Sequence, residues 1–141
     1  TCALPISTKI EAKLASSKKL FSFGPMTHDK LSDVYKATDI VYFPTAFGGE
    51  QHPVVGVEAI SSGCVLIASK FAGIVETIED GKTGFLINYP PSDDEGLEKL
   101  EHAINYLDSL DDLRQRAREF ALNTFSWDIT TRQLANVFKN L

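Results

Sequence analysis

The feature that most constrains the fold is a pair of continuous apolar runs, each followed by a stretch of helical character. The first run, "IVYFP", spans 40–44, and the second, "CVLIAS", spans 64–69. Apolar runs without polar alternation are typical of strands that are buried on both faces of a parallel sheet. Because parallel strands need helical crossovers, this alternation predicts an α/β domain with helices covering the sheet.

The flanking segments extend the same pattern. The run "KLFSF" (19–23) is expected to be a strand, and a helix over 27–39 follows with Thr27 as its N-cap. A second helix should begin near Pro53, because proline suits the first helical position, and should end at Gly63. The other predicted elements are a short helix over 73–80, a strand over 83–88 and helices from Asp93 onward.

Length and charge narrow the class of protein. The chain has 141 residues, about one domain, and a net charge of -5. An acidic chain gives no reason to expect nucleic acid, and no apolar run reaches the roughly 18 residues of a membrane span. The chain starts at Thr1 without a signal peptide, so we expect an internal piece of a longer protein. Cys2 and Cys64 match no metal spacing, and a reduced, cytoplasmic setting is expected.

The glycine-rich loop "TAFGGEQH" (45–52) follows a predicted strand and leads into a predicted helix. Ligands bind beyond the carboxyl ends of parallel strands, and free N–H groups at a helix start favour an anion such as phosphate. Gly48 and Gly49 would let the backbone approach a ligand closely. The alternative is a plain strand-to-helix turn.

Glu58 lies among valine, alanine and isoleucine, where a carboxylate is costly unless something pairs with it. Adjacent hydroxyls of a ribose or sugar are suitable donors to such a group. A salt bridge to a structural lysine, or a position at the edge of the apolar face, explains it equally well. Glu50, eight positions earlier, could simply favour the helix dipole.

Several other features are expected to be structural. His52 reads as a capping or loop residue, and Cys64 as a small buried hydrophobe. Phe125 and Trp127 are expected to anchor the last helix. A solvated helix face is expected to carry Arg114, Arg116 and Arg118.

The same stretch resembles the Glu-x7-Glu motif of retaining glycosyltransferases with the GT-B fold, the glycosyl transferases group 1. "LSDVYKATDIVYFP" is similar to the helix and strand before that motif, and "EAISSGCVLIAS" to the segment after it. "AGIVETIEDGKTGFLI" resembles "GGxxExxxDGxTGxLv", with Ala72 in place of the first glycine, and "FSW" resembles the start of the terminal helix. The resemblance runs from about residue 18 to 141.

The resemblance implies a Rossmann-like, doubly wound parallel sheet, present in part, as the C-terminal nucleotide-sugar-binding domain. In the strand order 3-2-1-4-5-6, the runs at 19–23, 40–44, 64–69 and 83–88 would be strands 3, 4, 5 and 6, with strands 1 and most of 2 before Thr1. Residues 126–141 would form a terminal helix that packs toward an absent N-terminal domain.

The resemblance also implies roles for residues. Glu58 would hold the ribose hydroxyls of a nucleotide-diphosphate sugar, and Glu50 would be the catalytic residue beside the donor sugar. The other implied donor-binding residues are Gly48, Gly49, Gln51, His52, Pro53, Gly24, Pro25, Gly73 and Glu76. The arginine and lysine that clamp the diphosphate in the family lie upstream of this segment, since no arginine precedes Arg114 and Lys9 and Lys13 do not match that motif.

The implied activity is sugar transfer with retention, from a UDP- or GDP-linked donor, without a cofactor or an obligatory metal. The acceptor would be a glycan, a lipid-linked compound or a small molecule, bound by a domain missing from this chain. The full-length protein would be cytoplasmic or peripheral to a membrane, and this chain alone is expected to be inactive. The alternatives are a nucleotide-sugar epimerase of the same fold and a non-catalytic nucleotide- or sugar-binding module.

Overall fold

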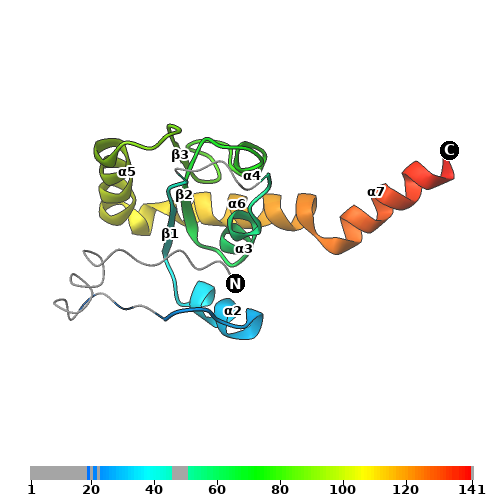
Figure 1. The fold of residues 1–141 in the computed structure, drawn as a ribbon, viewed down its shortest axis with the longest axis horizontal. Coiled ribbons are helices and arrows are strands. Elements are labelled where there is room, and N and C mark those ends of the chain that lie inside the picture. Colours follow the sequence, from blue (N-terminus) through cyan, green and yellow to red (C-terminus); the bar gives the residue numbers. More distant parts are fainter. Residues whose placement is uncertain (1–18, 20, 22, 46–50, 141) are drawn as a thin grey trace. The chain divides into compact units, whose positions relative to one another are not determined.

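The structure is a computed structural model, and it describes residues 19, 21, 23–45 and 51–140. The chain divides into two compact units, residues 1–31 and 32–141, and each is described by itself. The helix α2 spans His28–Lys36 (Figure 1), and the boundary between the units falls within it. Thr27 stands directly before it, and the Thr27 carbonyl oxygen accepts from the Leu31 N–H at 2.9 Å.

The strand predicted over 19–23 is wrong for the residues that can be described. Lys19, Phe21 and Phe23 have no strand conformation. The Phe21 and Phe23 rings stack with centroids 6.5 Å apart, and both side chains are exposed. The prediction rested on the apolar side chains alone, and a strand is stabilised by pairing its backbone with a neighbour.

The second unit contains a parallel sheet of three strands among its described residues: β1 (Ile40–Phe43), β2 (Val65–Ser69) and β3 (Phe85–Ile87). Their spatial order is β1-β2-β3, and both pairings are parallel. The register sets Ile40 beside Val65, and Ile67 beside Phe85. The predicted α/β class and the neighbouring order of the runs at 40–44, 64–69 and 83–88 are therefore confirmed.

Helices cover both faces of β2, as its apolar sequence predicts (Figure 1). On one face lie α3 (Val54–Ser61) and α4 (Ile74–Thr77). On the other, Val65 and Ile67 share a buried cluster with Ala103 of α5 (Asp93–Asn105). All five residues of β2 are buried, which is the environment that a continuous apolar run requires.

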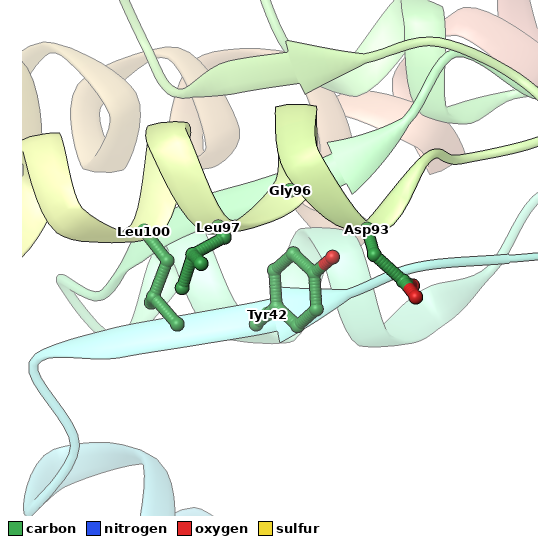
Figure 2. Close-up of a pocket in the computed structure, with 5 residues that line it drawn as sticks. All are labelled: Tyr42, Asp93, Gly96, Leu97 and Leu100. Carbon is green, nitrogen blue, oxygen red and sulfur yellow. The ribbon is translucent and has the colours of Figure 1, made fainter.

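The strand β1 is less buried than its sequence predicts. Its residues are half-buried, and Tyr42 is 39% exposed. The reason is its position, because β1 pairs with β2 alone in the described part of the sheet. Figure 2 shows the Tyr42 ring against α5, where its hydroxyl lies close to Gly96, and a shallow hollow of ≈ 290 Å³ opens there.

The end of α3 is closed by its own backbone and by side chains from α6 (Asp111–Phe125), which follows the short 3₁₀ helix η1 (Leu107–Leu110). Gly63, at φ 87°, turns the chain so that the Cys64 N–H donates to the Ala59 carbonyl. Arg114 Nε donates to the Gly63 carbonyl, and Arg118 to the Ser61 carbonyl, both at 2.8 Å.

The predicted solvated arginine face is confirmed for Arg116 and Arg118, which are exposed, whereas Arg114 is half-buried. The guanidinium groups of Arg114 and Arg118 satisfy carbonyl groups at the end of α3, where the helix dipole favours positive charge. Arg116 Nε donates to the Lys82 carbonyl at 3.2 Å. The sequence places these arginines on α6 but cannot show that α6 crosses the end of α3.

The last helix, α7 (Trp127–Lys139), leaves all of its side chains partly or fully exposed. Trp127 is 85% exposed, so its predicted anchoring is not seen in the described residues. Phe125, by contrast, packs against Phe120 with ring centroids 5.7 Å apart. Within the described residues, no helix is both long enough and apolar enough to cross a membrane.

Candidate functional site

The carboxyl edge of the sheet joins the loops that follow β1 and β2. The Thr45 N–H, just beyond β1, donates to the Ser69 Oγ at 2.9 Å. Ser69 ends β2 and is 1% exposed. This bond fixes the start of the glycine-rich loop to the end of the neighbouring strand, as expected for parallel strands that share an edge.

The same two loops meet again just before α3 and α4. The Gly73 N–H donates to the Gln51 carbonyl at 2.7 Å. A Cβ atom at position 73 would lie 2.0 Å from His52 Nδ1 and 2.9 Å from the Gln51 oxygen. Gly73 has an ordinary helical φ of −66°, so glycine is needed here for space and not for conformation.

The residue before this contact has an uncommon backbone. Ala72 has φ 47°, in the left-handed region where a Cβ atom is unfavourable. It allows the chain to turn sharply from the end of β2 into α4, whose N-cap is Gly73. The Thr77 hydroxyl then donates to the Gly73 carbonyl at 3.1 Å and secures the turn.

A hollow of ≈ 530 Å³ lies between the two loops. Phe125, at the end of α6, closes one side and packs on the His52 ring with centroids 5.8 Å apart. Sequence reasoning did not assign Phe125 to a site, because only the fold carries the end of α6 to this edge. The hollow is lined by Gln51, His52, Ala72, Gly73, Glu76 and Phe125.

The start of α3 lies immediately beyond this contact. Pro53 is the N-cap, so the helix begins at Val54, one residue later than predicted, and the Pro53 side chain is buried. The first turn of α3 carries no acidic side chain. The N–H groups and dipole of a helix start favour an anion, and nothing acidic on this turn opposes that preference.

Glu58 lies in the same helix, where it is half-buried. It does not line the hollow described above; its Oε2 accepts from the Tyr35 hydroxyl of α2 at 3.3 Å. Tyr35 is 8% exposed. Burial, and after it the neighbouring Glu58 carboxylate, raise the pKa of Tyr35 to about 12, so the hydroxyl stays protonated and donates.

The predicted site residues thus fall into separate groups. Gln51, His52, Gly73 and Glu76 line one hollow, with Pro53 adjacent, whereas Glu58 pairs with Tyr35. Gly24, at φ 63°, and Pro25 belong to the first unit. Gly48, Gly49 and Glu50 lie outside the described residues.

Comparison with known proteins identifies the family. Residues 7–120 match the family described as glycosyl transferases group 1. The chain belongs to this family. That result agrees with the resemblance found in the sequence and with a sheet that forms part of a Rossmann-like domain.

Individual relatives match much of the chain. The D-inositol 3-phosphate glycosyltransferase of Corynebacterium urealyticum is 26% identical over 136 residues, which are 94% of this chain and 30% of that protein. A solved glycosyltransferase from Rickettsia africae has a TM-score of 0.80 at 25% identity, covering 94% of this chain and 34% of its own. Anabaena HepE in complex with UDP has a TM-score of 0.68 at 25% identity, covering 77% and 29%. The chain therefore spans about a third of the length of these relatives.

Proposed function

We propose that this group 1 family chain is the donor-binding part of a retaining glycosyltransferase, which moves a sugar from a nucleotide-diphosphate donor to an acceptor. The observation that carries the proposal is the 2.7 Å bond from the Gly73 N–H to the Gln51 carbonyl. This bond brings together loops from two strand ends directly before α3. Both loops belong to the carboxyl edge, where ligands of such sheets bind.

The start of α3, Glu58 and Glu50 each have a role in the proposed binding of the donor. The start of α3 would hold the diphosphate, and Glu58 would accept from the ribose hydroxyls. Glu58 stands one turn beyond Val54, about 6 Å along the helix axis, so a single nucleotide could reach both. Glu50 would lie beside the donor sugar. The solved complex of HepE with UDP supports a nucleoside diphosphate as the ligand.

Glu58→Gln tests the ribose role in the full-length protein. Loss of a charged hydrogen bond should weaken UDP binding by about 1–3 kcal/mol. Isothermal titration calorimetry measures this directly. Glu98→Gln is the matched control, because Glu98 is an exposed glutamate on α5 and should bind UDP like the wild type. Unchanged affinity in Glu58→Gln would contradict the ribose role.

The reaction is tested with a radiolabelled nucleotide sugar. We expect the full-length protein to transfer the label to an acceptor with retained anomeric configuration, and Glu50→Ala to lose this activity. Release of an epimerised sugar would instead support the epimerase, and binding without turnover the non-catalytic module. The 141-residue chain by itself should show no turnover, because no arginine precedes Arg114 to clamp the diphosphate.

A further inference from the structure

The bond between Tyr35 and Glu58 joins two helices that are separate in sequence. The Tyr35 hydroxyl on α2 donates to Oε2 of Glu58 on α3 at 3.3 Å. The tyrosine is almost completely buried and the glutamate half-buried. A half-buried carboxylate gains more from a fixed donor than an exposed one does, because water competes less for it.

Tyr35 is itself held in place from several directions. Its carbonyl accepts from the Cys64 thiol at 3.3 Å and from the Thr38 N–H at 3.0 Å. Cys64 is fully buried at the end of α3, so this contact ties α2 to the helix that carries Glu58. The donor thus has a fixed backbone and a single-ring side chain with little freedom to move.

A fixed donor orients a carboxylate because it sets the direction of one of its oxygens. A carboxylate offers about four acceptor positions on its two oxygens, and the tyrosine hydroxyl occupies one on Oε2. Burial and the adjacent negative charge keep the Tyr35 pKa well above neutrality, so the hydroxyl donates at physiological pH. The Tyr35 hydroxyl thus uses one acceptor position of the Glu58 carboxylate, and the ribose hydroxyls would need others.

We propose that Tyr35 is a positioning residue that orients the Glu58 carboxylate for the adjacent hydroxyls of the nucleotide ribose. This inference rests on the proposed function, in which Glu58 accepts from the ribose. Tyr35 does not touch the ligand, and it acts through Glu58. Its removal should therefore affect only ligands that have the ribose diol.

Calorimetry on the full-length protein tests this with two probes, UDP and 2′,3′-dideoxy-UDP. Tyr35→Phe keeps the ring and should weaken UDP binding about fivefold, the scale of one hydrogen bond. It should leave the affinity for the dideoxy nucleotide unchanged. In the Glu58→Gln background, Tyr35→Phe should have no further effect on UDP. In a transfer assay, it should raise KM for the donor and leave kcat nearly unchanged.

Tyr42→Phe is the matched control, because it removes a hydroxyl from a tyrosine that is not bonded to Glu58 in the structure and lies on β1 against α5. It should bind both probes like the wild type, and circular dichroism should show the same fold for each variant. Equal losses of affinity for UDP and dideoxy-UDP in Tyr35→Phe would overturn the positioning role. The proposed function would still stand if Glu58→Gln weakened the binding of UDP and not that of dideoxy-UDP. An unchanged affinity in Glu58→Gln would overturn both.

Discussion

Gly73→Ala tests whether the two loops meet as the structure describes. The backbone at position 73 is helical, at φ −66° and ψ −6°, so alanine adopts it without conformational strain. The added Cβ would lie 2.0 Å from His52 Nδ1 and 2.9 Å from the Gln51 carbonyl oxygen. The substitution thus isolates a steric effect at the proposed donor site.

Two opposing effects decide the magnitude. Alanine restricts the unfolded chain more than glycine does, which would stabilise the fold by about 0.4–1 kcal/mol. Overpacking a tight contact costs about 1–3 kcal/mol. The His52 ring can rotate away, but the Gln51 oxygen belongs to the backbone and cannot move without disturbing the 2.7 Å bond to Gly73. We therefore expect a net destabilisation of about 1–2 kcal/mol.

Urea unfolding followed by circular dichroism measures the stability, and calorimetry with UDP measures the site. Adding His52→Ala should recover part of the lost stability, because it removes the nearer of the two clashes. The coupling between the two substitutions should reach about 0.5 kcal/mol or more, as expected for residues in contact. UDP affinity should fall in Gly73→Ala. A Gly73→Ala protein as stable as the wild type, without coupling to position 52, would refute the contact.

Other substitutions test single features. Ala72→Gly should stabilise the protein by about 1 kcal/mol, because glycine adopts the left-handed φ of 47° without strain. Gly81→Ala should destabilise it by about 1 kcal/mol, because Gly81 has φ 74° and open space around it, so the effect is one of backbone strain. Urea unfolding measures both changes. Arg114→Met removes a donor from the end of α3 and should cost about 1–2 kcal/mol in the same assay, against less than about 0.5 kcal/mol for Arg132→Met on exposed α7. Because the pKa of Tyr35 is raised to about 12, above its ordinary value of 10.0, its contribution to stability is complete below pH 10 and is lost as pH rises toward 12. Unfolding at alkaline pH should show a smaller loss in Tyr35→Phe, and an identical loss would contradict this reasoning.

Much of the fold followed from local sequence. The runs at 40–44, 64–69 and 83–88 form adjacent parallel strands in the expected order. An uninterrupted apolar run indicates a strand that is buried on both faces, and such strands are typical of parallel sheets covered by helices. The α/β class could therefore be inferred from the sequence. The run at 19–23 has no strand conformation at its described positions, because an apolar run alone does not provide the neighbouring strand that a sheet requires.

Individual residues of the candidate site could be predicted from the sequence, but which of them lie together could not. The loop residues Gln51 and His52 and the turn residues Gly73 and Glu76 were identified from their motifs, and the structure places all four around one hollow. Their donor-binding role stays a prediction. Phe125 completes the same hollow, although nothing in its sequence neighbourhood distinguishes it from a core aromatic.

The sequence by itself determined the strand runs at 40–44, 64–69 and 83–88, the approximate places of the helices, and the presence of a glutamate among apolar residues. These features depend on the types and spacing of residues that are close together in the sequence. Only the tertiary structure decided that Tyr35 lies against Glu58, 23 residues away, and that Arg114 reaches the end of α3, 51 residues away. Such contacts depend on how helices cross, and crossing is set by the packing of whole faces and not by any local pattern.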